Sequence, residues 1–185
     1  MARLGAAALM GTCLAVSGCA RSGLDTTAAA AEKLSAAATA YVAVPEDGRF
    51  GTEDYAGSGR TVAALVAAAL SQHFSHVHVA PEPQAAREDL AQARAGGFTY
   101  LIRPTILRWE DHDTAWLGGA DRARILLETI DVASGDAADV AVVEARADAL
   151  VPGGETVTPA EALEAPIVGY ARRLVPLQTV TGFHR

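Results

Sequence analysis

The sequence is poor in cysteine. Its two cysteines, Cys13 and Cys19, both lie near the amino terminus, so no thiol occurs after residue 19. The bulk of the chain therefore has no means to form a disulfide bond, a cysteine nucleophile or a thiolate metal site. Aromatic residues are also few, at 5% of the chain, so each tryptophan carries weight in packing or binding.

Basic residues are scarce as well. Lysine and arginine together number 15 against 22 aspartates and glutamates, which gives a formal net charge of −7. Nucleic-acid binding draws its affinity from clustered cations that neutralise phosphates. The charge balance therefore predicts no nucleic-acid partner.

The first apolar run is too short to cross a membrane as a helix. It covers residues 4–16, behind the single positive charge of Arg3, and such a run is typical of a secretory signal peptide. It ends in VSGC at residues 16–19, which resembles the lipobox of bacterial lipoproteins. We expect cleavage between Gly18 and Cys19, with a lipid carried on the thiol of Cys19. A secretory signal cut elsewhere and an uncut membrane anchor are the alternatives.

The lipid on Cys19 predicts membrane attachment in the cell envelope. Ala20 follows the cysteine, where an aspartate often signals inner-membrane retention, so the outer membrane facing the periplasm is the predicted location. The expected organisation is a signal peptide at residues 1–18, the lipidated cysteine and a flexible tether at 19–40, a single α/β periplasmic domain at 41–176, and a tail at 177–185.

Hydrophobic periodicity predicts an α/β (α+β) fold with a single mixed sheet in the order β-α-β-α-β-β-β-α. The first three strands, joined by helical crossovers, should be parallel, and the remaining strands should form an antiparallel meander. Residues 46–57 are expected to be a polar loop. Pro104 indicates an edge or a bulge in its strand, and Pro166 is expected to split the last helical region. Strands are predicted at residues 41–44, 76–79, 98–109, 122–132 and 140–147, and helices at 61–74, 84–95 and 158–174.

Four pieces of sequence carry a resemblance to a known family. They are YVAVP at residues 41–45, YAGSG at 55–59, Trp109-Glu110 followed by Trp116, and IDVASG at 130–135. In this order and spacing they resemble a family of small proteobacterial lipoproteins that is catalogued only as a domain of unknown function. The resemblance implies a lipoprotein and no particular activity.

The order of strands and helices is more distantly similar to two periplasmic folds. These are the periplasmic domain of the curli secretion lipoprotein and the amino-terminal domain of the Tol-system propeller protein. Both folds serve envelope assembly or transport through protein contacts. This chain lacks the membrane-spanning β segments of the curli pore, so the resemblance does not imply pore formation.

Three histidines form a candidate metal site. His76 and His78 should share a strand face, and His73 could reach them from the end of the preceding helix. Three imidazoles suit zinc or copper. A solvated strand face is the alternative, and we predict no bound metal and no cofactor.

The helix start at Ser58-Gly59-Arg60 invites an anion-binding interpretation. Free backbone N–H groups and the helix dipole favour an anion at such a position. A dinucleotide fingerprint and a Walker lysine are both missing, however, so an ordinary helix start is the alternative.

The loop after residue 109 is the candidate partner surface. It carries Glu110 and Asp111 in an acidic run, and Trp116 ahead of two glycines. We expect Trp109, at a strand end, to be buried, and Trp116, in the loop, to be partly exposed. Tryptophans dominate many interfaces, so Trp116 could be a contact residue; packing in the core is the alternative.

No catalytic signature occurs in the chain. The sequence therefore predicts a non-catalytic lipoprotein whose partner is an envelope protein or another copy of itself, in surface assembly, secretion or transport. The alternative is a periplasmic lipoprotein that binds a ligand or metal.

Overall fold

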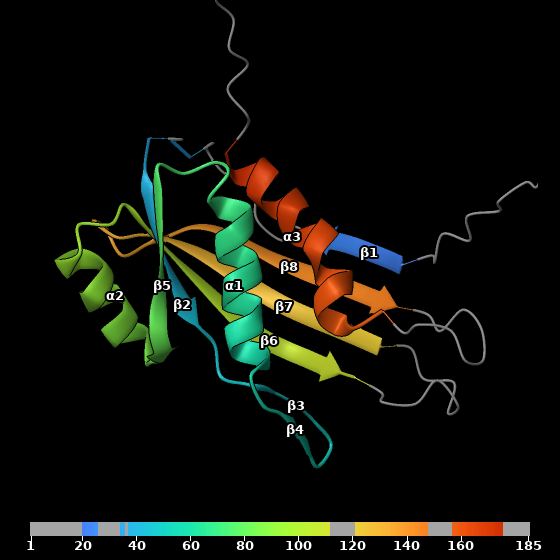
Figure 1. Ribbon diagram of the computed structural model, residues 1–185. Coiled ribbons are helices and arrows are strands. Elements are labelled where there is room, and N and C mark those ends of the chain that lie inside the picture. Colours follow the sequence, from blue (N-terminus) through green and yellow to red (C-terminus); the bar gives the residue numbers. More distant parts are fainter. Residues whose placement is uncertain (1–19, 26–33, 36, 112–120, 148–156, 176–185) are drawn as a thin grey trace, which may run out of the picture.

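The computed structural model describes residues 20–25, 34, 35, 37–111, 121–147 and 157–175 (Figure 1). A six-stranded sheet forms its centre, in the order β1-β8-β7-β6-β2-β5. The strands are β1 (Ala20–Asp25), β2 (Thr39–Val44), β5 (His76–Pro83), β6 (Tyr100–Glu110), β7 (Asp121–Asp131) and β8 (Ala137–Ala147). The helices are α1 (Ser58–Leu70), α2 (Ala86–Ala95) and α3 (Pro159–Leu174).

The predicted mixed sheet is confirmed. Strand β2 pairs in parallel with β5 on one side and with β6 on the other. Strands β6, β7 and β8 form the antiparallel meander, and β1 continues it. The chain moves from β2 to β5 through α1 and then returns past β2 to β6 through α2. Since both crossovers are expected to be right-handed and run in opposite directions, α1 and α2 belong on opposite faces of the sheet.

The core lies between the sheet and the α1–α3 layer, which Figure 1 shows in front of the strands. The buried residues of α1 recur at helical spacing, as Val62, Val66 and Leu70. They pack with fully buried α3 side chains such as Leu163 and Tyr170. This burial of branched and aromatic side chains is what holds the alanine-rich elements together. Within the described part of the chain, no helix is both long and apolar enough to cross a membrane.

The expected tether at residues 19–40 differs from the structure. Ala20–Asp25 form strand β1, which pairs antiparallel with β8 from Ala20↔Ala147 to Asp25↔Val142. Without β1, the backbone groups of β8 would form an open sheet edge. Backbone pairing requires no particular side chains, so a small, polar sequence gave no strand signal. Leu34 also belongs to the domain, because its N–H donates to Leu174 O at 3.0 Å.

The expected polar loop at residues 46–57 contains a short hairpin. Its strands are β3 (Gly48–Phe50) and β4 (Glu53–Tyr55), which pair with each other and not with the main sheet. Gly51, with a φ of 61°, makes the turn between them, and Arg49 pairs with Asp54 across it. Strands of three residues are too short to produce a readable alternation.

Helix α3 is continuous, although Pro166 was expected to split it. The predicted capping box is present: the Thr158 hydroxyl accepts from Glu161 N–H at 3.3 Å, and Glu161 accepts from Thr158 N–H at 2.8 Å. This N–H lowers the pKa of the Glu161 carboxyl. Tight packing of Leu163 and Ile167 on either side of Pro166 holds the helix together despite the missing N–H.

The strand position of Pro104 follows the prediction. Strand β6 pairs with β2 only as far as Ile102, so at Pro104 it has a neighbour on the β7 side alone. On the side of β2, the ladder has therefore ended before the residue that lacks an N–H. A register shift follows between Ile106 and Arg108, and it leaves Leu107 unpaired.

Candidate functional site

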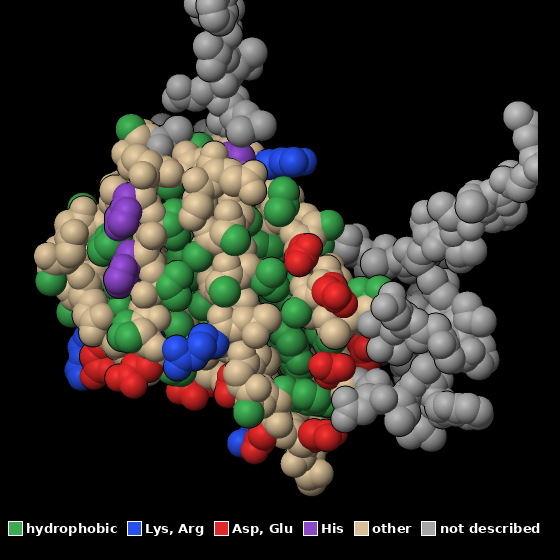
Figure 2. All heavy atoms as spheres, in the orientation of Figure 1, with side chains coloured by type: hydrophobic (Ala, Val, Ile, Leu, Met, Phe, Trp, Pro, Cys, Tyr) green, Lys and Arg blue, Asp and Glu red, His purple; other side chains and the backbone are tan. Residues whose placement is uncertain are grey.

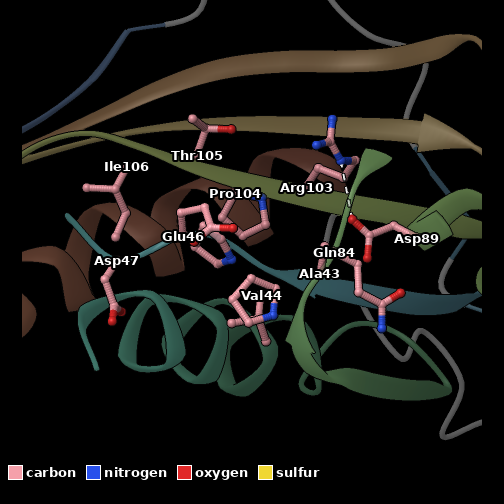
Figure 3. A pocket seen from close by; sticks show the side chains of 12 residues that line it. Ala43, Val44, Glu46, Asp47, Gln84, Asp89, Arg103, Pro104, Thr105 and Ile106 are labelled. Atoms are coloured by element: carbon pink, nitrogen blue, oxygen red, sulfur yellow. Dashed lines mark ion pairs between the residues drawn. The ribbon is translucent and has the colours of Figure 1, made fainter. Parts of the chain in front are cut away.

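A pocket of about 260 Å³ opens where β2 and β5 end (Figure 3). The chain leaves β2 at Pro45, and β5 ends at Pro83, while β6 continues past both and forms the far wall. In open sheets with crossovers on opposite faces, ligands bind outside the carboxyl ends of the parallel strands. The fold therefore places this pocket where α/β proteins commonly bind ligands.

A buried carboxylate dominates the pocket. Asp89, in the first turn of α2, is 1% exposed and faces Arg103 of β6. Arg103 Nε lies 3.6 Å from Asp89 Oδ2, and its Nη1 lies 3.5 Å from Glu128 Oε2 on β7. Burial raises the pKa of the Asp89 carboxyl, and the charge of Arg103 opposes that rise only in part.

Two oxygens in this pocket are buried without a hydrogen-bond partner among the described residues. They are Oδ1 of Asp89 and Oε1 of Gln84, and both side chains line the cavity. Figure 3 shows Asp89 bound to Arg103 on one side, with Gln84 nearby at the end of β5. Buried acceptors are rarely left unpaired in folded proteins, so a pair of them marks a place where a hydrogen-bond donor is missing.

A second carboxylate closes the start of α1. Asp47 Oδ2 accepts from Gly57 N–H at 3.0 Å, and Oδ1 accepts from Gly59 N–H at 2.8 Å. The Ser58 hydroxyl accepts from Gly48 N–H at 2.8 Å. A carboxylate of the chain itself therefore occupies the helix start that we considered for an anion. The YAGSG sequence holds the β2–α1 connection in place.

The three candidate histidines do not form a metal site. No group of three or more histidine, cysteine, aspartate or glutamate side chains able to hold a metal occurs in the described ranges. His76 and His78 are exposed on one face of β5, as expected, and Figure 2 shows histidines along that side of the molecule. Their rings lie 5.9 Å and 5.8 Å from the ring of Phe98. His73 is only 8% exposed, after the end of α1.

The structure describes only some of the residues around the predicted partner surface. Trp109 is 4% exposed, as expected. Glu110 is also 4% exposed and pairs with Arg108, so its interpretation as an exposed contact residue is wrong. Trp109 and Glu110 are consecutive residues in regular register with β7, so their side chains lie on opposite faces of the sheet, and both are buried. Asp111 is half-buried, and Trp116 lies outside the described residues.

The pocket residues were missed by sequence reasoning. Asp89, Gln84 and Arg103 come from a helix, a connection and a strand, and each is an ordinary polar residue in its own segment. The one local signal is Arg103, an arginine inside an otherwise apolar strand segment. The lipidation residues Gly18 and Cys19 lie outside the described part of the chain.

Comparison with known sequences places the chain in a family. The sequence profile of the domain of unknown function DUF4823 matches residues 32–174, so the chain belongs to this family. No curated protein matches the sequence.

Solved structures share the fold. The chain is similar to the PelC dodecamer from Paraburkholderia phytofirmans, with a TM-score of 0.63 and 15% identity, over 85% of this chain and 98% of that one. A variant PelC dodecamer from the same organism gives a TM-score of 0.62 and 16% identity, over 85% and 99% of the two chains. At such identity the likeness defines the fold and leaves the activity open.

Proposed function

We propose that this chain is a lipid-anchored accessory protein of the cell envelope that acts through protein contacts and not through catalysis. Its first partner is another copy of itself. The observation that carries the proposal is the similarity to PelC, a dodecamer, over 98% of that chain. The same fold in a closed assembly supports self-association of this chain, because soluble homo-oligomers are commonly symmetric and built from one repeated interface.

The lipid anchor rests on the VSGC sequence at residues 16–19, and the outer-membrane location rests on Ala20. Cys19 carries the lipid, and strand β1 begins at the next residue. The lipid and the sheet are therefore adjacent in the chain. The domain would sit close to the bilayer on its periplasmic side.

The assembly is tested on the full lipidated protein extracted in mild detergent. Native mass spectrometry and light scattering should give a mass of several copies. Crosslinking in intact membranes should give a ladder of the same multiples. A monomer in detergent at every concentration, together with no crosslinked ladder in membranes, would overturn the proposal.

The anchor is tested separately with two cysteine variants. Cys19→Ser should abolish lipid labelling and release the processed domain from membranes. Cys13→Ser is the matched control, because it removes a thiol of the signal peptide and should leave labelling intact. Membrane retention of an unlabelled, processed Cys19→Ser protein would show that the lipobox interpretation is wrong.

The loop that carries Trp116 remains our candidate for the contact surface. Strands β6 and β7 pair from Tyr100↔Asp131 to Glu110↔Arg122, so the two ends of this loop leave from neighbouring paired strands. Trp116→Ala should reduce the fraction of oligomer or of captured partner while leaving thermal unfolding little changed. Phe50→Ala, which removes an aromatic ring that is 43% exposed on another hairpin, is the matched control. Equal effects of the two variants would argue against Trp116 as an anchor.

A further inference from the structure

We propose that the pocket at the carboxyl ends of β2 and β5 binds an organic cation with N–H donors, a guanidinium or primary ammonium group. Asp89 Oδ1 and Gln84 Oε1 are the two acceptors that receive it. This proposal does not rest on the proposed function. Neither the family nor the similar structures assign it.

The first argument is the identity of the unpaired atoms. The Asp89 side chain is 2% exposed, and only its Oδ2 faces Arg103. Asp89 and Gln84 both line the cavity. Asp89 Oδ1 and Gln84 Oε1 are buried acceptors, and no described residue donates a hydrogen bond to either. An anion would add further acceptors and leave both atoms unpaired. A group that pairs with both atoms must therefore be a donor, either neutral, such as water, or positively charged.

The second argument is the charge around the cavity. Glu46, Asp47 and Asp89 line it against one cation, Arg103, which is itself shared with Glu128. Both oxygens of Asp47 already accept hydrogen bonds from backbone N–H groups. Asp47 therefore adds negative charge near the cavity but is not expected to bind the ligand directly. Figure 2 shows further acidic side chains around the β3–β4 hairpin. The surroundings therefore favour a positive donor over a neutral one.

The third argument is size and donor number. A cavity of about 260 Å³ falls just below the ~300–1,000 Å³ of drug-sized sites, so it suits a head group with a short stem. Guanidinium carries five N–H donors and no acceptor, and ammonium carries three. Hydrogen bonds from such cations to a carboxylate are stronger than neutral ones. A metal ion fits less well, because no metal-binding group occurs among the described residues.

The same chemistry has two sources, which are a free small amine and an arginine side chain of a bound protein. Agmatine, a guanidinium on a short chain, represents the first source. A blocked Gly-Arg-Gly peptide represents the second. Tetramethylammonium is the matched control ligand, since it carries a positive charge and no N–H donor.

Binding is measured by calorimetry on the full lipidated protein in detergent. Agmatine should bind saturably with one site per chain, and tetramethylammonium should not bind. Asp89→Asn should weaken agmatine binding by about tenfold or more, because it removes a charged acceptor. Gln84→Met should weaken it less. Glu144→Gln removes an exposed carboxylate of β8 that pairs with Arg124 of β7, and it should leave agmatine binding unchanged.

The outcomes decide the proposal in each case. Absence of saturable binding by both agmatine and the peptide would overturn it, as would equal binding to the wild type and Asp89→Asn. If Asp89→Asn fails to fold, Gln84→Met against Glu144→Gln gives the same decision. Tighter binding of agmatine points to a free amine, and tighter binding of the peptide points to a protein partner. The oligomer mass is measured in the same samples. A failure to bind agmatine or the peptide can therefore be distinguished from a failure to form oligomers.

Discussion

Arg173 of α3 binds Asp139 of β8 through two parallel hydrogen bonds, from Nη1 to Oδ1 at 2.7 Å and from Nη2 to Oδ2 at 2.5 Å. The Asp139 side chain is completely buried, whereas that of Arg173 is 26% exposed. Beside them, the buried Tyr170 hydroxyl lies 2.6 Å from Thr129 Oγ1. These two polar contacts dock the last helix on the sheet and fix its position along the strands.

The exposure difference between the two partners predicts an asymmetry in stability. Arg173→Met leaves a buried carboxylate without its cation and should cost about 3–5 kcal/mol in the free energy of unfolding. Asp139→Asn should cost less, about 1–3 kcal/mol, because Arg173 can turn towards solvent. Urea unfolding at neutral pH measures both. Equal losses in the free energy of unfolding would show that leaving Arg173 unpaired costs as much as leaving Asp139 unpaired, despite the greater exposure of Arg173.

Two helical glycines predict effects of opposite sign. A Cβ on Gly59, in the first turn of α1, would lie 2.2 Å from the carbonyl oxygen of Pro45. Since that oxygen belongs to the backbone, Gly59→Ala should destabilise by about 1–3 kcal/mol or more. Gly169, inside α3, has open space for at least 4 Å around the position that a Cβ would take, so Gly169→Ala should stabilise by about 0.5–1 kcal/mol. Thermal unfolding of the two variants side by side tests the pair, and a shift of the same sign in both would contradict the packing argument.

Trp109 is expected to be structural. Its side chain is 4% exposed. A Cβ added to Gly48 of β3 would lie only 2.6 Å from the Cβ of Trp109, so the β3–β4 hairpin packs closely against this tryptophan of β6. Trp109→Ala should cost about 3–5 kcal/mol, measured by denaturant unfolding. Leu107→Ala on the same strand, where the side chain is 49% exposed, should stay within about 0.5 kcal/mol of the wild type. A small loss for Trp109→Ala would make this tryptophan a contact candidate instead.

The elements that the sequence revealed are those whose pattern is local. Helix α1 and the three long antiparallel strands show their periodicity within a single window, and the parallel β2 shows a buried run closed by Pro45. Strand β1 was missed because its sequence, ARSGLD, shows no alternation of apolar and polar residues. The local propensity of Pro166 predicts a break in α3. Packing of the helix against the core overrides this propensity, and packing cannot be seen in the local sequence.

The candidate site was beyond sequence reasoning for a related reason. What distinguishes Asp89 is that one of its oxygens lacks a partner, and this depends on residues of β5 and β6 as much as on α2. The histidines and the acidic loop attracted attention because their residues are close in sequence. In the structure, Glu110 and His73 are both buried, so proximity along the chain was a poor guide to shared function.

Asp89 predicts a pH dependence of stability that its removal should eliminate. Burial raises the pKa of its carboxyl above the ordinary value of 3.8, so between these two values the folded state binds more protons than the unfolded state. Stability contributed at this position is therefore highest at low pH and falls as pH rises through the folded pKa. Asp89→Asn carries no titrating proton, and Arg103 keeps Glu128 as a partner in the variant.

As pH rises from the ordinary pKa of aspartate, the free energy of unfolding of Asp89→Asn should therefore rise relative to that of the wild type. At neutral pH the variant should be the more stable protein. Urea unfolding at intervals from about pH 3 to pH 7 measures this difference. Glu144→Gln, an exposed carboxylate in a surface pair, should show a small and nearly constant difference. A neutral-pH loss of stability in Asp89→Asn would mean that the contact with Arg103 outweighs the penalty of burial. A gain in stability together with lost agmatine binding would indicate that the buried carboxylate is kept for its ligand at the expense of stability, a trade commonly found at binding sites.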